Sequence, residues 1–263
     1  MGVALRVGEL TMIGLRDGDF LMPTRFLGDP DAHRQLAEAD GVVRLPVGCF
    51  LMPGDEPVLI DAGIGPDLNL EMMPGGRLLD ELSSVGIRPD EVRHLALSHL
   101  HADHIGWIAR KREGITFPNA QLYVAEDDWH HFLVDEHDPK PMPWVRAALI
   151  DLADRGRVTV LDGETQLARG VTAMPAPGHT PGHTVYVIHD HGDRALLFGD
   201  AIYCPQQLTE VDWEATSDVD PVLARRTREH LWREIEQGGG VGVGPHFPGL
   251  RGGRVFGSTW LPG

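Results

Sequence analysis

The chain has 263 residues, 42% of them hydrophobic, so it is long enough to bury a substantial core, and we expect residues 1–263 to form a single domain. Its 39 acidic and 23 basic residues give a formal net charge of −16, which would repel a phosphate backbone and argues against nucleic acid as a partner. Cys49 and Cys204 are too few and too far apart for a disulfide framework or a cysteine-based zinc module.

The N-terminal segment carries Arg6 and Glu9 where a secretory signal needs an uninterrupted apolar region. No later stretch is long and apolar enough to span a membrane, so we expect no membrane contact. With both cysteines expected to be free thiols, the sequence favours a soluble, cytoplasmic protein. A homodimer is allowed by the sequence, which does not fix the oligomeric state.

The first sixty residues alternate short β-rich runs with turn clusters, as in an antiparallel meander, and include the expected strands 42–47 and 58–60. Apolar residues then recur at helical spacing over 77–86, where Gly86 is a suitable end. The segment 94–98 is typical of a buried strand. The sequence His-Leu-His-Ala-Asp-His, residues 99–104, follows where this strand should run into a loop.

The second half of the chain continues with a strand, two helices, a run of strands and a last helix that Asp220 and Pro221 are expected to begin. This order predicts two sheets sandwiched between helices. The expected strands are 121–124, 158–161, 171–174, 184–188 and 195–198, with a turn at 189–194, and the expected helices are 126–134, 144–153 and one from 220 through 235.

The segment 99–104 is suited to binding two metal ions. His99 and His101 can converge on one ion, while Asp103 and His104 are adjacent and point toward a second site. Imidazole and carboxylate ligands at this density suit zinc or a similar divalent ion. The alternative, a solvated polar loop, is disfavoured because the segment follows a buried strand.

Further ligands lie at the ends of other predicted strands. His179 occurs in Pro-Gly-His-Thr-Pro-Gly-His, Asp200 in Phe-Gly-Asp-Ala, and His246 in Gly-Pro-His. Each lies where a β run gives way to a glycine or proline turn, a position where functional side chains are often displayed.

Taken in order, these motifs resemble those of the metallo-β-lactamase superfamily over most of the chain. The resemblance implies an αββα sandwich of the α+β class, with two mixed β-sheets flanked by helices. It also implies two divalent ions per chain, with zinc expected. One ion would be held by His99, His101 and His179, the other by Asp103, His104 and His246, with Asp200 bridging them.

The bridging Asp200 disfavours a β-lactamase, because the β-lactamases of the superfamily lack an aspartate there, whereas lactonases, glyoxalase II enzymes and organophosphate hydrolases have it. The nuclease branches carry additional motifs that this chain lacks. The tail after His246 is too short for the C-terminal helical region of glyoxalase II enzymes.

Tyr203, three positions after Asp200, resembles the tyrosine with which N-acyl homoserine lactone lactonases (quorum-quenching enzymes) hydrogen-bond the substrate carbonyl. A phenol there could stabilise an oxyanion; the alternative is a tyrosine that only packs in the core. Asp103 is the candidate proton donor to the leaving alkoxide.

The expected function is therefore a metal-dependent hydrolase that opens N-acyl homoserine lactones or related lactones, with a hydroxide between the metals as nucleophile. The expected partner is a small molecule with an ester or lactone group. An organophosphate triester, a thioester or a carboxylic ester is the alternative substrate, and a non-enzymatic metal-binding protein is the third hypothesis.

Several other residues are weaker candidates. We expect His183 to orient the loop around His179, Asp61 to support the metal-binding loop, and Cys204 to be no nucleophile. A hydrophobic acyl pocket could be lined by apolar residues of predicted loops, namely Phe20, Met22, Phe50, Trp107 and Trp213. Surface positions are expected for His130, His131, His137, His189 and His191.

Overall fold

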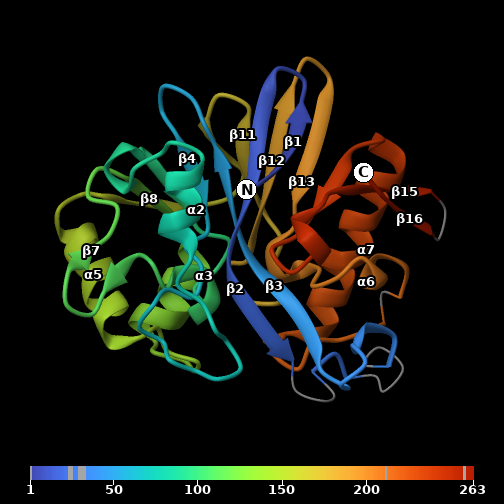
Figure 1. Ribbon diagram of the computed structural model, residues 1–263, viewed down its shortest axis with the longest axis horizontal. Coiled ribbons are helices and arrows are strands. Elements are labelled where there is room, and N and C mark those ends of the chain that lie inside the picture. Colours follow the sequence, from blue (N-terminus) through green and yellow to red (C-terminus); the bar gives the residue numbers. More distant parts are fainter. Residues whose placement is uncertain (1, 23–25, 29–33, 211, 257–258) are drawn as a thin grey trace.

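A computed structural model describes residues 2–22, 26–28, 34–210, 212–256 and 259–263. Two seven-stranded sheets pack face to face, with helices α2 (Leu78–Ser84) and α5 (Pro143–Asp154) outside one sheet and α7 (Pro221–Gly238) outside the other (Figure 1). The α+β sandwich predicted from the sequence is confirmed.

The first sheet has the order β1-β2-β3-β4-β5-β8-β9. Strands β1 to β4 form the predicted antiparallel meander, and β4, β5, β8 and β9 are parallel, so the sheet is mixed. The strands are β1 (Val3–Val7), β2 (Leu10–Met22), β3 (Val43–Met52), β4 (Val58–Ile60), β5 (His94–Ala96), β8 (Gln121–Ala125) and β9 (Val158–Leu161).

The second sheet runs from β10 to β16 in sequence order and is antiparallel except between β13 and β14. The hairpin expected at 189–194 is tighter than predicted, because β12 continues to Asp190 and β13 starts at Asp193. The strands are β10 (Thr165–Ala168), β11 (Val171–Pro175), β12 (Thr184–Asp190), β13 (Asp193–Leu197), β14 (Val241–Val243), β15 (Gly253–Phe256) and β16 (Thr259–Pro262), while β6 (Ala109–Arg110) and β7 (Gly114–Ile115) form a separate ribbon.

The helix predicted over 126–134 is two elements, α4 (Glu126–Trp129) and the π-helix His130–Val134. Helix α7 begins as predicted, since the Asp220 carboxylate accepts a hydrogen bond from the Leu223 amide at 2.9 Å. Further short helices are α3 (Ala102–Ile105), α6 (Gln206–Thr209) and the 3₁₀ turns Pro89–Glu91, Gly199–Ala201 and Pro248–Leu250.

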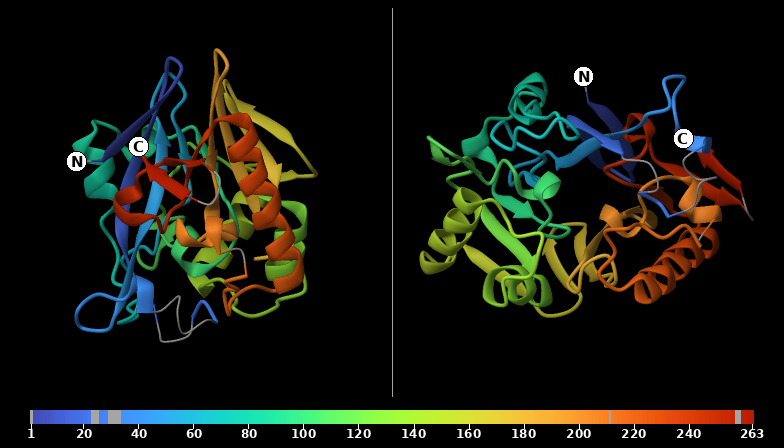
Figure 2. Two further views of the ribbon diagram at one scale, coloured as in Figure 1. Left: turned by 90° about the vertical axis from the view of Figure 1, so that its right-hand side faces the viewer. Right: turned by 90° about the horizontal axis from the view of Figure 1, so that it is seen from below.

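Alternating side chains of each sheet fill two separate layers of the core. On β3, Phe50 belongs to the cluster between the sheets, whereas Cys49 and Leu51 belong to the cluster beneath α2 and α5. On β12, Tyr186 faces the inter-sheet cluster and Val185 the cluster beneath α7. Figure 2 shows the same layers from two further directions.

Within the described residues, no helix is both long enough and apolar enough to cross a membrane.

Candidate metal centre

Side chains from four loops meet in one place, and each loop directly follows a strand. His99, His179, Asp200 and His246 come after β5, β11, β13 and β14 respectively. Because β13 and β14 are parallel, Asp200 and His246 leave the second sheet at the same end. These residues are buried together with His101, Asp103 and His104.

The loop after β4 holds the segment 99–104 in position from behind. The Ala62 amide donates to the His104 carbonyl at 2.7 Å, and the Trp107 amide donates to the Ala62 carbonyl at 2.8 Å. Gly106 lies so close to this loop that a Cβ atom there would come within 1.8 Å of the Ile64 carbonyl oxygen. Only glycine fits at this contact.

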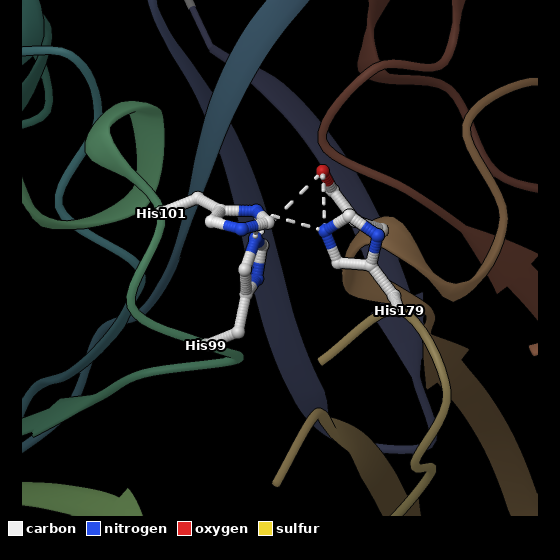
Figure 3. Close-up of side chains that lie close together, drawn as sticks. His99, His101 and His179 are labelled. Atoms are coloured by element: carbon white, nitrogen blue, oxygen red, sulfur yellow. Dashed lines mark hydrogen bonds and ion pairs between the residues drawn. The ribbon is translucent and has the colours of Figure 1, made fainter. Parts of the chain in front are cut away.

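The first ligand cluster consists of His99, His101, His179 and one oxygen of Asp200. Figure 3 shows the three imidazoles turned toward one another, His99 and His101 from one segment and His179 from another. His101 Nδ1 lies 3.0 Å from His99 Nε2 and 2.9 Å from His179 Nε2. Asp200 Oδ2 lies 3.8 Å from His99 Nε2 and 3.6 Å from His179 Nε2.

The second ligand cluster consists of Asp103, His104, His246 and the other oxygen of Asp200. Asp200 Oδ1 lies 3.2 Å from both His104 Nε2 and His246 Nε2. Asp103 Oδ2 lies 3.6 Å from each of the same two nitrogens. Asp200 is thus shared, with one carboxylate oxygen toward each cluster.

The donor set fits a pair of divalent metal ions. Three buried atoms, His104 Nε2, His246 Nε2 and Asp200 Oδ1, have no hydrogen-bond partner in the described part of the chain. Buried polar atoms normally have hydrogen-bond partners. These three atoms face one another without such a bond, which is the arrangement expected of metal ligands. Two ligand atoms on a tetrahedral zinc ion with bonds of about 2.0 Å lie roughly 3.3 Å apart, close to the separations seen here.

The pKa shifts of the histidines divide by cluster. Burial lowers the pKa of His99 and of His101 well below the usual value, so both imidazoles are neutral and their lone pairs are free to bind metal. Burial also opposes protonation of His104, but the combined charges of Asp200, Asp103 and Asp61 outweigh it and raise the pKa of His104. The same negative charge would attract a divalent cation.

Groups behind the ligands orient the imidazoles. His104 Nδ1 lies 2.9 Å from Asp61 Oδ2, and Asp61 also accepts hydrogen bonds from the Ser98 amide and hydroxyl. His246 Nδ1 donates to the Pro46 carbonyl at 2.8 Å. With Nδ1 engaged, the Nε2 lone pair of each ring faces the cluster.

Tyr203 lies directly beside both clusters. Its ring stacks on His246 with centroids 5.2 Å apart and planes inclined by 8°, and it meets His179 edge to face at 5.7 Å. Its hydroxyl lies 3.0 Å from the Ser217 hydroxyl. Burial, together with the nearby charge of Asp200, raises the pKa of Tyr203 well above 10, so the phenol keeps its proton.

Comparison with known proteins identifies the family. Residues 42–237 match the model of the metallo-beta-lactamase superfamily. The chain belongs to this superfamily. It is accordingly a hydrolase of the metallo-β-lactamase fold, as the order of its motifs predicted.

Its relatives include lactonases at low identity. The chain is 25% identical over 214 residues to the N-acyl homoserine lactonase AiiA of Bacillus thuringiensis subsp. kurstaki, covering 74% of this chain and 79% of that protein. The structure of AidC, a dizinc quorum-quenching lactonase, superposes with a TM-score of 0.85 at 22% identity over 100% of this chain and 97% of the other. The structure of the hydrolase AbOPH superposes with a TM-score of 0.83 at 23% identity, over 99% of this chain and 97% of the other. The two structures support the superfamily fold.

The residues expected to line an acyl pocket fall into two groups, those that pack with Tyr203 beside the ligand clusters and those that pack elsewhere. Phe20, Met22 and Trp213 share one apolar cluster with Tyr203. Phe50 and Trp107 do not, so their assignment to an acyl pocket is wrong. Phe50 is buried between the sheets, and Trp107 packs beneath the helices with its indole N–H donated to Asp17.

His183 supports the site through two kinds of contact. Its carbonyl accepts a hydrogen bond from the Ala176 amide at 2.7 Å and its amide donates to the Thr180 carbonyl at 3.3 Å, so it holds the loop around His179 as predicted. Its Nε2 accepts a hydrogen bond from the Asp200 amide at 3.0 Å, so it fixes the shared aspartate. Burial lowers the pKa of His183 to about 3, which keeps this nitrogen able to accept. Burial likewise raises the pKa of the neighbouring Cys204 thiol to about 12, as expected for a cysteine that is no nucleophile.

The five histidines expected at the surface are there or close to it. His130, His137, His189 and His191 are exposed, and His131 is half-buried and stacked on His137 at 4.5 Å. None of the five belongs to either ligand cluster.

Several buried carboxylates that support the centre were missed from the sequence, among them Asp17 and Asp128. Asp17, on β2, accepts hydrogen bonds from the backbone amides of Ile64, Gly65, Gly76 and Leu78 and from the Trp107 indole. Asp128, on α4, accepts hydrogen bonds from the Thr180 hydroxyl and the Gly182 amide and so fixes the loop of His179. Neither lies in a recognisable motif, because every donor is distant in sequence.

Proposed function

We propose that this protein is a dimetal lactonase that opens N-acyl homoserine lactones or closely related lactones. The observation that carries the proposal is the place of Tyr203, a buried and protonated phenol stacked on His246 beside two ligand clusters that share Asp200. The similarity to curated N-acyl homoserine lactonases supports the same substrate class.

The two clusters divide the proposed ligands into two sets. His99, His101 and His179 would hold one divalent ion, Asp103, His104 and His246 the other, and Asp200 would bind both. Zinc is the first candidate, because imidazole nitrogens and carboxylate oxygens are among its usual ligands. When bound, the two ions would supply a water deprotonated near neutral pH and a Lewis acid for the substrate carbonyl.

Tyr203 is proposed to donate a hydrogen bond to the oxyanion that forms as the lactone carbonyl is attacked. Either hydroxyl of the Tyr203–Ser217 pair can be the donor. When Ser217 donates, the phenol hydrogen is left for the substrate oxygen. A preorganised donor of this kind is worth about 3 kcal/mol in the transition state.

Asp103 is proposed to take the proton of the hydroxyl group that has added to the carbonyl carbon and to pass it to the alkoxide that leaves as the carbon–oxygen ring bond breaks. Its carboxylate faces His104 and His246, and its side chain keeps 8% of its surface exposed, more than the 3% of Asp200. This exposure gives the proton a route to solvent.

The apolar cluster around Tyr203 suits an acyl chain. Phe26 meets the Tyr203 ring edge to face at 5.2 Å, and Phe20 meets Phe26 in the same way at 5.1 Å. Met22 and Trp213 complete the apolar surface next to the clusters. Ligand sites commonly combine such a surface with a few fixed polar groups.

We also propose that residues 1–263 form one domain, because the ligands of each cluster come from both sheets and neither sheet alone holds a complete set. The cytoplasm is the proposed compartment. Cys49 and Cys204 are both buried free thiols, which suits a reducing environment.

A substrate panel tests the proposed function. Zinc-loaded protein would be assayed for acid release from N-acyl homoserine lactones of short and long acyl chain and from simple γ-lactones, beside a phosphotriester, a thioester and an aryl ester. We expect the highest kcat/KM on an acyl homoserine lactone. Faster turnover of the phosphotriester, thioester or aryl ester than of every lactone would reject the lactonase assignment and favour the alternative substrates.

A further inference from the structure

A buried arginine and aspartate lie directly behind one of the proposed metal ligands. Asp218 precedes α7 and Arg228 lies within it, and their side chains are 0% and 1% exposed. Asp218 Oδ1 accepts from His179 Nδ1 at 3.0 Å, and Asp218 Oδ2 accepts from Arg228 Nη1 at 3.2 Å. The contacts form a chain from Arg228 through Asp218 to His179. On its other side, His179 Nε2 faces His101, as Figure 3 shows.

Stability alone is a weak reason for such a pair. The cost of removing two charges from water offsets most of their attraction, and apolar residues of similar volume often serve a core equally well. Arg228 is the largest fully buried side chain in the described part of the protein, on a helix face otherwise occupied by Leu231 and Ile235. The charge of Arg228 is therefore better explained by the contact that its partner Asp218 makes with His179.

The contact with His179 has a direct consequence for metal binding. A carboxylate that accepts from Nδ1 fixes the tautomer with its lone pair on Nε2 and makes that nitrogen a stronger donor to a metal. Arg228 offsets the charge of Asp218 and bonds its second oxygen, so the buried carboxylate is held in one orientation.

The other ligand cluster is supported differently. Asp61 accepts from His104 Nδ1, but its further hydrogen bonds come from the uncharged Ser98 amide and hydroxyl. His246 donates to a backbone carbonyl. His179 is thus supported by a carboxylate that is itself paired with a guanidinium, whereas the supports of His104 and His246 have no such charged partner in these contacts.

We propose that Asp218 and Arg228 are positioning residues that set the affinity of the His99, His101 and His179 cluster for its metal ion separately from the affinity of the Asp103, His104 and His246 cluster. The inference rests on the proposed dimetal function. It predicts that Asp218 affects one metal-binding step and not the other.

Stepwise metal binding tests this inference without reference to turnover. Metal-free protein would be titrated with Zn²⁺ in competition with a chromophoric chelator, which yields both dissociation constants. We expect Asp218→Asn to raise one constant by about 10–100-fold and leave the other within about twofold. Asp61→Asn should instead affect both constants, because Asp61 contacts His104 directly and reaches His99 through the Ser98 hydroxyl. Arg225→Met removes an exposed charge of the same helix, paired with Asp212 at 2.6 Å, and should change neither.

A second pair of variants separates metal binding from folding. Arg228→Met alone leaves a buried carboxylate without its cation, so the Tm of the metal-free protein should fall. The double variant Asp218→Asn with Arg228→Met removes both charges and should recover most of that Tm. The double variant should still bind one zinc ion with the raised dissociation constant of Asp218→Asn, which a purely structural role would not produce.

The outcomes distinguish this inference from the proposed function. If Asp218→Asn changed neither constant, or raised both equally, the selective role would be overturned while the dimetal centre stood. If the wild-type chain bound a single ion, and Asp218→Asn lowered the affinity for that ion, the dimetal function would fail and the role of Asp218 would stand. A wild-type chain that bound no ion would overturn both.

Discussion

Replacing Tyr203 by phenylalanine removes one oxygen atom and keeps the ring that stacks on His246 and meets His179. Because the aromatic contacts remain, the positions of the proposed ligands should not change. The substitution therefore isolates the phenol hydroxyl from the metal centre beside it.

The expected loss of turnover follows from the hydroxyl's surroundings. Removing one donor to a developing oxyanion typically lowers kcat by about 10²–10³. The Tyr203 hydroxyl is shared with Ser217, so we expect the lower end of that range, about 100-fold, with little change in KM. The Ser217 hydroxyl is half-buried and can be solvated in its place, so the free energy of unfolding should fall by less than about 1 kcal/mol.

Proton release from the best lactone substrate measures kcat and KM, and elemental analysis of the same samples measures the metal. Tyr123→Phe is the control, because its hydroxyl contacts a histidine, His94, at 3.0 Å outside the two clusters. A Tyr203→Phe enzyme with wild-type kcat and a full metal content would show that the hydroxyl has no part in the reaction. A loss of metal would show instead that Tyr203 acts through the ligands.

Three further perturbations test the scaffold. Asp17→Ala leaves several buried N–H groups without an acceptor, each at a cost of about 1–3 kcal/mol. Chemical denaturation of the metal-free protein should therefore show a free energy of unfolding lower by several kcal/mol, or the variant should fail to fold. A decrease below about 1 kcal/mol would contradict the contacts described. Gly106→Ala places a Cβ against the Ile64 carbonyl and should shift the segment 99–104, lowering bound metal per chain. Gly238→Ala is the control, because Gly238 has open space at its Cβ position and, like Gly106, no positive φ. Removing metal with a chelator should lower the Tm, because ions bind the folded ligand set, and zinc should restore it; an unchanged Tm would argue against ligands organised by folding.

The ligands could be predicted because local patterns mark them. The segment 94–98 is apolar and ends in 99–104, and the structure places β5 at His94–Ala96 with His99 just beyond it. His179, Asp200 and His246 likewise follow strands, and glycine or proline beside each marks the turn. Their order along the chain indicated the superfamily, and with it the two-sheet fold.

The supporting contacts could not be predicted, since they depend on three-dimensional neighbours. Asp17 lies within an ordinary strand, and its partners come from residues 64 to 107. Phe50 and Trp107 were misassigned because hydrophobicity does not reveal which face of a strand or loop meets the site. His183 contacts Asp200 only because β12 and β13 are neighbours in the second sheet.

The central claim is a centre of two metal ions that share Asp200. Elemental analysis of the protein loaded with zinc and freed of excess metal measures it directly, with Asp200→Asn analysed in parallel. We predict two ions per wild-type chain and fewer than two in Asp200→Asn, because the amide carries one oxygen and no charge. One ion or none in the wild-type chain, or two ions held equally well by Asp200→Asn, would contradict the account.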